Sequence, residues 1–413
     1  MSDFSPLREL AELAMGETIV AADCDGLGFP VFSADTGDAP WNWSSKIKKI
    51  NRAGTIVVGA RGSIGFPRAP DFSEFGATQT TITVTPNRKR ILPAYLFQAL
   101  SRVDFQAISA QQAIPMLTVS ELSEVKIRNL DLSQQAYIAT ILGALDAVIY
   151  ESRSIVEKIL AAKRGLLNDL LTRGIDANGE LRRTHKEAPH LYKQSKLGWI
   201  PNAWNDLLLG GMLKAIDAGW SPSCPEEPPN VGEWGVLKVS AITSGKYVPS
   251  ESKRLPSNLK PVPAFEVQEG DVLLARANGV AELVATTVLV GSTQPRLMLS
   301  DKTLRLVPFR DRLTDSYLAH AMSSSRTRMQ VNGMLNGSSG QQNISQAQIR
   351  RLCIPVPPLD EQCEGMIRVG EIDKRIESES SALAKFRKIR SGLMDDLLTG
   401  RVRVTPLLDT ALP

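Results

Sequence analysis

The sequence has 413 residues, of which 43% are hydrophobic and 22% charged, and its formal net charge is +4. This length exceeds one ordinary core and fits two or three domains, and the composition is that of a globular protein. The four cysteines never form a CxxC pair, which argues against a structural zinc site or a disulfide framework. Because the start is not signal-like and no apolar run approaches about 18 residues, we expect a soluble, cytoplasmic protein.

Charge is distributed unevenly along the first hundred residues. Residues 1–39 contain Arg8 as their one basic residue and eight acidic ones, whereas residues 46–102 contain ten basic and two acidic residues. The ten are Lys46, Lys48, Lys49, Arg52, Arg61, Arg68, Arg88, Lys89, Arg90 and Arg102. Such a stretch indicates a surface that faces a polyanion, because neutralised phosphates release counterions; a solvated basic face without a ligand is the alternative.

Two blocks of the chain share a weak pattern of strands and loops. In the first, "AGTIVVGARGSIG" (53–65) places an apolar run before Arg61, and strand-like "TTITVTP" and helix-like "PAYLFQAL" follow. In the second, "EGDVLLARANG" (269–279) places one before Arg276, and "TLRLVPF", "DSYLAHAM" and the polar stretch "LNGSSGQQNIS" (335–345) follow. An arginine that leaves a buried strand beside glycines can present its guanidinium to DNA, although a structural turn is the commoner role.

Each block is followed by a segment that predicts one long amphipathic helix. Apolar residues recur at spacings of three and four over residues 132–173 and again over 359–399, with no proline in either stretch. Ser133 or Asp360 can act as N-cap, with Glu361 in the first turn of the second helix, and Gly174 and Gly400 occupy the positions expected of C-terminal glycines.

The two helical segments are copies of one sequence. A shift of 227 residues aligns "LSQQ" at 132–135 with "LDEQ" at 359–362 without a gap, and 13 of the 41 paired positions are identical. An internal duplication follows. An antiparallel pair of helices is the natural arrangement, because the domain between them can return the chain to the far end; core helices in separate domains are the alternative.

The order of these parts resembles the specificity subunit of type I restriction-modification systems. The resemblance rests on the alternation of a variable domain with a long helix that ends in "LLxG", on "KLGWIPNAW" (196–204), on "PVPPLDEQ" before the second helix and on "DDLLTGRVRV" at its end. It covers essentially the whole chain. The first half departs from the pattern, with "NLDLSQQ" in place of the proline-rich segment and no clear tryptophan motif at its start.

This resemblance implies an α/β (α+β) protein with two globular target-recognition domains separated by two long antiparallel coiled-coil helices in a pseudo-twofold internal repeat. We expect the first recognition domain at 1–131, the central spacer helix at 132–174, a linker at 175–195, the second recognition domain at 196–357, the C-terminal spacer helix at 358–401 and a tail at 402–413. Each recognition domain would read one half of a bipartite double-stranded DNA target. The helices would set the length of the DNA spacer between the two half-sites and would dock two methyltransferase subunits. Restriction and translocase subunits would then join this complex.

The candidate DNA-binding residues fall into two classes by chemistry. Closely spaced cations suit a line of phosphates, and these are Lys46, Lys48, Lys49, Arg52, Arg88, Lys89 and Arg90. Arginine and amide side chains suit base edges, and these are Arg61, Arg276, Asn278, Gln341, Gln342 and Asn343. We expect no catalytic residue, no metal and no cofactor on this chain, with S-adenosylmethionine and ATP on the partner subunits.

Two other classes of protein remain as alternatives. A lone methyltransferase or nuclease would need motifs that the chain only imitates: "EEPPN" (226–230), "PDFSEFG" (70–76) and "GARGSIG" (59–65) each lack a residue that the chemistry requires. A coiled-coil adaptor without a DNA role explains the helices but leaves two large domains unused. A gel-shift assay with and without a methyltransferase partner would separate the three.

Overall fold

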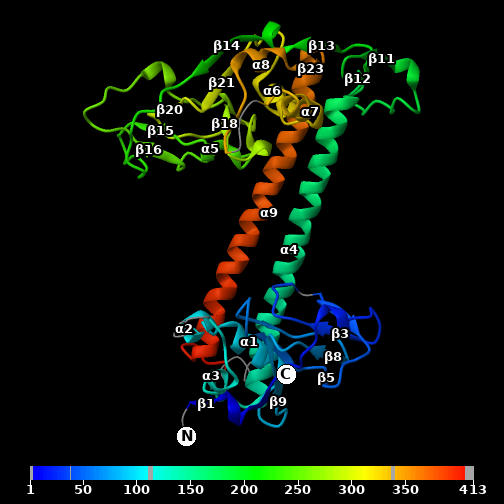
Figure 1. Cartoon of the computed structure of the whole chain (residues 1–413), viewed down its shortest axis with the longest axis vertical. Coiled ribbons are helices and arrows are strands. Elements are labelled where there is room, and N and C mark those ends of the chain that lie inside the picture. Colours follow the sequence, from blue (N-terminus) through cyan, green and yellow to red (C-terminus); the bar gives the residue numbers. More distant parts are fainter. Residues whose placement is uncertain (1–2, 38, 110–114, 336–339, 405–413) are drawn as a thin grey trace, which may run out of the picture. The chain divides into compact units, whose positions relative to one another are not determined.

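The computed structural model describes residues 3–37, 39–109, 115–335 and 340–404. They fold into two compact units, of which the first comprises Met1–Ile155 with Glu379–Pro413 and the second Val156–Ser378. Both boundaries fall inside long helices. Each unit therefore holds one globular domain together with a part of α4 (Leu132–Thr172) and a part of α9 (Leu359–Thr399) (Figure 1).

The globular domain of the first unit is built from short strands and three short helices. Its strands are β1 (Phe4–Pro6), β2 (Ala11–Met15), β3 (Phe29–Phe32), β4 (Asn42–Ser44), β5 (Asn51–Arg52), β6 (Ile56–Gly59), β7 (Gly65–Arg68), β8 (Glu74–Ala77), β9 (Thr81–Pro86) and β10 (Lys126–Arg128). Its helices are α1 (Pro93–Ser101), α2 (Phe105–Ser109) and α3 (Val119–Ser123).

The domain of the second unit repeats this mixture. Its strands are β11 (Tyr192–Ser195), β12 (Gly198–Pro201), β13 (Asn205–Leu208), β14 (Leu213–Ala218), β15 (Gly235–Leu237), β16 (Ser252–Arg254), β17 (Val272–Ala275), β18 (Ala277–Asn278), β19 (Thr287–Leu289), β20 (Leu297–Met298), β21 (Thr303–Pro308), β22 (Gln342–Asn343) and β23 (Cys353–Val356). Its helices are α5 (Ser240–Thr243), α6 (Asp315–Met322), α7 (Ser325–Asn332) and α8 (Gln346–Arg351).

The main sheets of the two domains have the same strand order. The first runs β2-β9-β6-β7 and the second β14-β21-β17-β19, with every pair antiparallel. β6 and β17 lie inside their sheets and are buried along their whole length, as their apolar runs predict. A smaller sheet in each domain contains one parallel pair, β3 with β8 and β15 with β20. The duplication therefore extends beyond the helices into both domains.

A buried tyrosine ties the first helix after each main sheet to the strand that precedes the long helix. The hydroxyl of Tyr95 on α1 donates to the carbonyl of Arg128 at 3.3 Å, and that of Tyr317 on α6 donates to the carbonyl of Pro355 at 2.8 Å. Burial raises the pKa of both phenols, that of Tyr95 to about 12. Both hydroxyls therefore keep the proton that each hydrogen bond needs.

A buried glutamine at the start of each long helix holds three backbone groups. Gln135 accepts from the Leu92 N–H at 2.8 Å and donates to the carbonyls of Arg90 and Leu130 at 3.0 and 2.9 Å. Its copy Gln362 accepts from the Thr314 N–H and donates to the carbonyls of Arg312 and Pro357, all at 2.9 Å. This explains the repeated glutamine of "LSQQ" and "LDEQ", since buried backbone groups need partners.

The two long helices pair antiparallel within each unit. In the first unit Asp146 of α4 forms an ion pair with Arg390 of α9, and Arg128, just before α4, donates to the carbonyl of Leu397 near the end of α9. In the second unit Lys163 near the end of α4 pairs with Asp373 at 2.5 Å. The start of each helix thus lies beside the end of the other, which confirms the predicted antiparallel pairing.

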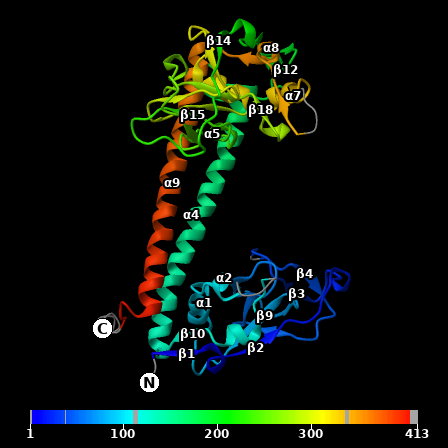
Figure 2. The same ribbon diagram turned by 60° about the vertical axis from the view of Figure 1, so that its left-hand side comes forward.

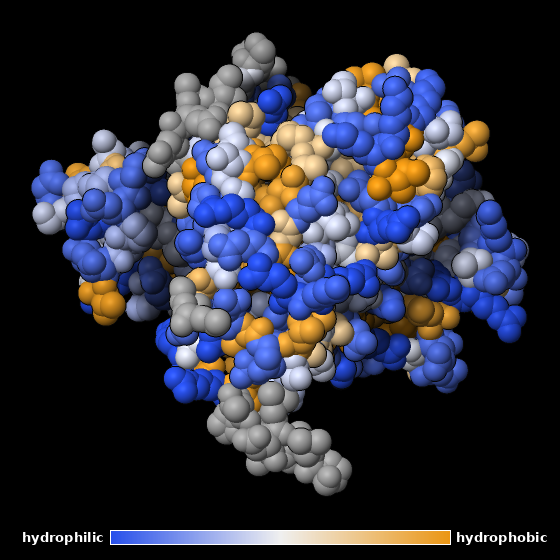
Figure 3. All heavy atoms as spheres, turned by 90° about the horizontal axis from the view of Figure 1, so that it is seen from below, coloured by the Kyte–Doolittle hydropathy of each residue, from blue (hydrophilic) through white to orange (hydrophobic). Residues whose placement is uncertain are grey.

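The main core of each unit joins the domain to the helices. Leu96 of α1 is buried with Ile138 of α4 and Leu397 of α9, and Leu318 of α6 is buried with Leu170 of α4. Figures 1 and 2 both show α1 beside α4. On the face drawn in Figure 3, hydrophilic side chains predominate and apolar ones gather in smaller patches.

The helix starts differ from the predicted N-caps. α4 begins at Leu132, and it is the Asp131 carboxylate that accepts from the Gln134 N–H, at 2.8 Å; Ser133 is already helical. α9 begins at Leu359, so Asp360 lies inside its first turn. The predictions were wrong by one or two residues because several neighbouring side chains could all cap a helix. The predicted C-terminal glycines are confirmed, with φ of 60° at Gly174 and 85° at Gly400.

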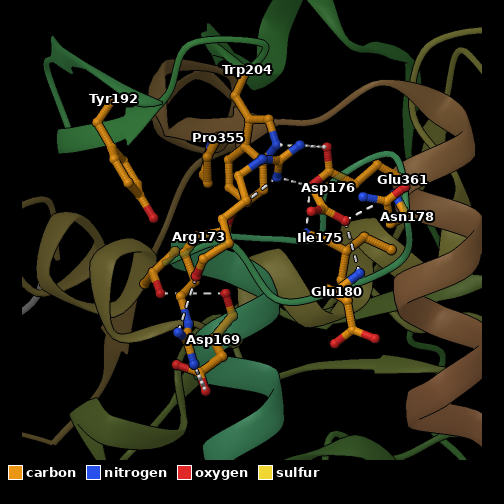
Figure 4. Close-up of polar contacts among 12 residues, drawn as sticks. Asp169, Arg173, Ile175, Asp176, Asn178, Glu180, Tyr192, Trp204, Pro355 and Glu361 are labelled. Carbon is orange, nitrogen blue, oxygen red and sulfur yellow. Dashed lines mark hydrogen bonds and ion pairs between the residues drawn. The ribbon is translucent and has the colours of Figure 1, made fainter. Parts of the chain in front are cut away.

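Glu361 joins the start of α9 to the segment that follows α4 (Figure 4). Its carboxylate pairs with the Arg182 guanidinium and accepts from the Ile175 N–H at 2.9 Å and from the Trp204 indole N–H at 3.0 Å. The Trp204 side chain is fully buried. A Cβ on Gly174 would lie 2.0 Å from the Glu361 Oε1 atom. The glycine is therefore required both by its positive φ and by this close approach.

We expect Gln135→Leu to lower the free energy of unfolding by roughly 2–4 kcal/mol, because it removes three part-buried hydrogen bonds, one to an N–H and two to carbonyls of the backbone. Gln362→Leu should give a similar loss, and the exposed Ser133→Ala should change stability by less than about 0.5 kcal/mol. Urea unfolding of the three variants measures this. A loss at Gln135 no larger than at Ser133 would contradict the role given to the glutamine.

Gly174→Ala should destabilise the protein by roughly 2 kcal/mol more than Gly198→Ala. Both glycines have a positive φ, but nothing lies within 4 Å of a Cβ built on Gly198. The difference in unfolding free energy between the two variants isolates the crowding around Glu361 from the cost of the backbone conformation. Equal losses would show that crowding contributes nothing.

Candidate nucleic-acid interface

A two-stranded ribbon in the second unit brings the amide candidates together. β18 and β22 pair antiparallel, with Ala277 opposite Asn343 and Asn278 opposite Gln342. Gln341 directly precedes β22. Residues far apart in sequence therefore share one element, and the side chains of Gln341 and Asn343 are exposed on it. A ribbon of two strands is narrow enough to enter the major groove of DNA.

Arg276 lies at the base of this ribbon and is held by its backbone. Its N–H donates to the carbonyl of Lys302 at 2.8 Å, and its carbonyl accepts from the Ile344 N–H at 3.0 Å. Within the described part of the chain, the Arg276 guanidinium makes no hydrogen bond or ion pair. The side-chain amide oxygen of Asn278, in contrast, accepts from the Val280 N–H at 2.9 Å and shapes the turn.

The ribbon combines a rigid base with adaptable polar groups. β17, which leads directly to Arg276, is buried along its whole length, so the backbone of the arginine is fixed by the sheet. Its planar guanidinium can donate two hydrogen bonds to guanine, and the amides of Gln341 and Asn343 can pair in the same two-pronged manner with adenine. A preorganised backbone lowers the entropic cost of such contacts.

Lys302 is a residue of this site that the sequence pattern did not single out. It is exposed in the turn between β20 and β21, and its carbonyl accepts from the Arg276 N–H. The stretch "SDKT" marks a turn, but nothing in it shows that the turn would meet Arg276. Lys302 lies beside Arg276 because β17 and β21 pair in the sheet.

Arg328 of α7 is a structural residue beside the site. Burial lowers the pKa of its guanidinium, which donates to the carbonyls of Glu282 at 3.3 Å and of Val284. It thereby fixes the turn that follows β18. Its hydrogen-bonding capacity is used within the domain, unlike that of Arg276.

Arg61 of the first unit lies in the exposed turn between β6 and β7. Its Nε–H donates to the Met116 sulfur at 3.0 Å, which is a weak acceptor, and its backbone N–H donates to the carbonyl of Thr80 at 3.1 Å. The side chain remains exposed. The guanidinium therefore keeps most of its donors for a ligand.

Arg61 and Arg276 do not occupy equivalent positions. The residue with the backbone contacts of Arg276 is Ala60, whose N–H donates to the carbonyl of Thr80 and whose carbonyl accepts from the Leu117 N–H, at 2.8 and 2.9 Å. Arg61 is the next residue along the chain. The similar sequence patterns around the two arginines thus conceal a shift of one position, which directs the two side chains differently.

Lys46, Lys48, Lys49 and Arg52 are exposed on the segment from the end of β4 to β5. The carboxylate of Glu17 accepts from the backbone N–H groups of Lys48 and Lys49 at 2.9 and 3.4 Å. This leaves the lysine side chains outside the hydrogen bonds that order the segment, except for a 3.5 Å contact of the Lys49 ammonium. A basic, ordered segment of this kind suits phosphate contacts.

The turn formed by Arg88, Lys89 and Arg90 is partly committed to its own domain. The Arg88 guanidinium donates to the carbonyl of Ala53 at 2.8 Å, and that of Arg90 donates to the carbonyl of Glu9 at 2.6 Å. Each arginine keeps free donors but has a fixed position. Lys89 alone extends without a polar side-chain contact in the described structure.

The candidates of the first unit fall at opposite ends of the paired strands β6 and β9. Gly59 is opposite Thr81 at the end that carries Arg61, whereas the contact of Arg88 with Ala53 lies at the other end. Four strand residues span roughly 13 Å. The Arg88 turn therefore lies near Arg52, which directly precedes Ala53, and apart from Arg61. Lys49 instead contacts Met15, which pairs with Ile82 toward the end that carries Arg61. Their DNA contacts remain predictions.

The sequence is similar to specificity subunits of type I restriction enzymes. It is 32% identical over 221 residues to the type I restriction enzyme EcoEI specificity subunit of Escherichia coli, a match that covers 53% of this chain and 37% of that protein. It is 24% identical over 367 residues to the MjaVIII specificity subunit of Methanocaldococcus jannaschii, covering 86% of this chain and 78% of that protein.

A similar fold occurs in a solved structure, the type I restriction-modification S subunit from M. genitalium, with a TM-score of 0.59, 16% sequence identity and coverage of 96% of this chain and 95% of that one. The family described as the type I restriction modification DNA specificity domain matches residues 2–159 and 201–385. These matched ranges contain most of both duplicated domains and most of both long helices. The chain belongs to the family of type I restriction-modification DNA specificity proteins.

Proposed function

We propose that this chain is the sequence-specific DNA-binding specificity subunit of a type I restriction-modification complex. Each globular domain reads one half of a bipartite target, and the helices α4 and α9 set the spacer between the halves. The observation that carries this proposal is the duplicated domain, which has the same strand order in both units and packs in each on the antiparallel helix pair. A duplicated reader suits a target in two parts.

Exposed apolar side chains on the helices support docking of two methyltransferase subunits. Tyr150 of α4 is 73% exposed, and Ile367 of α9 is 57% exposed. Further exposed apolar residues of the two helices are Val148, Ile155, Leu160 and Ile389. Such side chains are typical of a surface that another helix covers.

α4 is long and apolar enough, by length and composition, to cross a membrane. Its ion pair between Asp146 and Arg390 and its pairing with α9 favour a protein partner instead. Restriction and translocase subunits would join the same complex, within the cytoplasm.

The chain would act without chemistry of its own. Methyl transfer and strand cleavage would take place on partner subunits, which would bind S-adenosylmethionine and ATP. A second solved relative, 16% identical and with a TM-score of 0.51, comes from work on complex assembly of a type I system. In the proposed organisation, the recognition domains span 1–131 and 196–357 and the spacer helices span 132–174 and 358–401. A linker (175–195) and a tail (402–413) complete the chain.

Arg276→Ala should weaken binding to the cognate site by roughly 1–3 kcal/mol and relax discrimination at one position of one half-site. Lys48→Ala should weaken binding to all sequences alike and lower the slope of log affinity against log salt by about one. Gel-shift titrations of the complete complex at several salt concentrations, with cognate and scrambled duplexes, measure both. An Arg276 variant with unchanged affinity and methylated motif would make that arginine structural.

Deletion of residues 151–157 together with 379–385 should shorten the preferred spacer and leave both half-site sequences unchanged. The ion pairs of Asp146 with Arg390 in the first unit and of Lys163 with Asp373 in the second have the same antiparallel register, and this register pairs the two deleted segments in sequence. A heptad removes close to two full turns, so the helix faces stay nearly in phase. Sequencing of methylated adenines reads out spacer and half-sites. Altered half-sites with the original spacer would refute the role of the helices as a ruler.

A further inference from the structure

A polar cluster at the contact of α1 with the long helices is repeated in the second unit. The Gln98 amide of α1 donates to Asp146 at 2.8 Å and accepts from Arg390 at 3.0 Å, so one side chain bridges both members of the interhelical ion pair. The Gln98 side chain is 4% exposed. The shift of 227 residues pairs Asp146 with Asp373 and Lys163 with Arg390.

The residue of the second unit that corresponds to Gln98 is His320 on α6. Both follow their buried tyrosine, Tyr95 or Tyr317, by three residues. His320 lines the same crevice as Lys163 and Asp373, the ion pair of the second unit. The cluster of the first unit thus has a counterpart at each of its three positions.

A different side chain occupies this position in the second unit, and among the described residues no hydrogen bond joins it to Lys163 or Asp373. Burial, helped by the charge of Lys163 and opposed by that of Asp373, lowers the pKa of His320 to about 4. Near neutral pH its imidazole is therefore uncharged and has one N–H donor and one nitrogen acceptor, like the amide of Gln98. A donor suits the aspartate and an acceptor suits the cation.

We propose that Gln98 and His320 are positioning residues that fix how each recognition domain sits on the helix pair, and that they thereby restrict the spacer the protein accepts. The inference about the spacer rests on the proposed function. Apolar packing of Leu96 against Ile138 attracts the domain to the helices but tolerates small shifts, because it has no direction. The ion pair that Gln98 bridges accepts one arrangement, since any shift leaves the buried Gln98 amide without a partner. His320 has the donor and the acceptor to impose the same restriction on the pair of Lys163 with Asp373.

The test compares Gln98→Leu and His320→Leu with the cross-copy exchanges Gln98→His and His320→Gln in the complete complex. Arg102→Ala is the matched control, because its ion pair with Asp395 also joins the end of α1 to α9 but is 44% exposed on both sides. Methylation is measured on duplexes with the preferred spacer and with spacers one base pair longer and shorter. The leucine variants should lose about tenfold in the ratio between preferred and altered spacers, the scale of one hydrogen bond to a charged group. Gln98→His, His320→Gln and Arg102→Ala should keep the wild-type ratio between preferred and altered spacers.

An equal loss of methylation on all spacers would mean that the two residues serve stability alone, and an unchanged ratio would equally overturn the proposal. Amide hydrogen exchange of α1 gives a second readout that needs no DNA. Exchange there should accelerate at least several-fold in Gln98→Leu and stay unchanged in Arg102→Ala; without acceleration the positioning role fails. A wild-type complex that methylates no bipartite target would refute the proposed function, while the exchange measurement still decides whether Gln98 positions its domain.

Discussion

The antiparallel pairing of α4 with α9 is the constraint on which the remaining structure depends. Each helix has 41 residues, and an amphipathic helix of this length needs a partner for its apolar side. Because the pair is antiparallel, the first unit receives the start of α4 with the end of α9, and the second receives the end of α4 with the start of α9. Both domains therefore meet one helix start and one helix end, which explains how one domain architecture can serve in both units.

Both copies of the domain retain the side chains that hydrogen-bond to backbone groups. Gln135 and Gln362 each hold one N–H and two carbonyls, and Tyr95 and Tyr317 each hold one carbonyl. The residues in the turns differ between the copies. After β6 the first domain has Ala60, whereas at the same position after β17 the second domain has Arg276. A frame that stays constant while its turns vary is what a pair of readers for two different half-sites requires, since backbone geometry positions the site and side chains at the turns specify the bases.

The sequence alone was sufficient for the features that repeat or have a period. The shift of 227 residues predicted two long helices, and the turn chemistry predicted Gly174 and Gly400 at their ends. It was insufficient where a side chain finds its partner on another element. Ser133 and Asp360 were placed as caps because a local pattern cannot separate neighbouring candidates, and the inward contacts of Arg88 and Arg90 arise from loops that lie far away in sequence. Lys302 entered the candidate interface by strand pairing, which periodicity does not reveal.

The ends of the long helices show how one physical requirement selects different residues. The last carbonyls of a helix lack intrahelical partners and carry a partial negative charge, which favours a cation. Arg182 donates to the carbonyl of Arg173 at the end of α4, and Arg128 donates to that of Leu397 at the end of α9, at 3.0 and 2.9 Å. Arg182 comes from the linker and Arg128 from β10, so no shift of the sequence aligns them.

The glycines at these ends align even though the arginines do not. A Cβ on Gly174 would lie 2.7 Å from the Arg182 Nη1 atom, and one on Gly400 would lie 2.6 Å from the Arg128 Cζ atom. Each guanidinium needs the space that a side chain on the glycine would fill. The duplication therefore preserved the residue that creates the space, whereas the arginine that fills it could be recruited from whichever element was near.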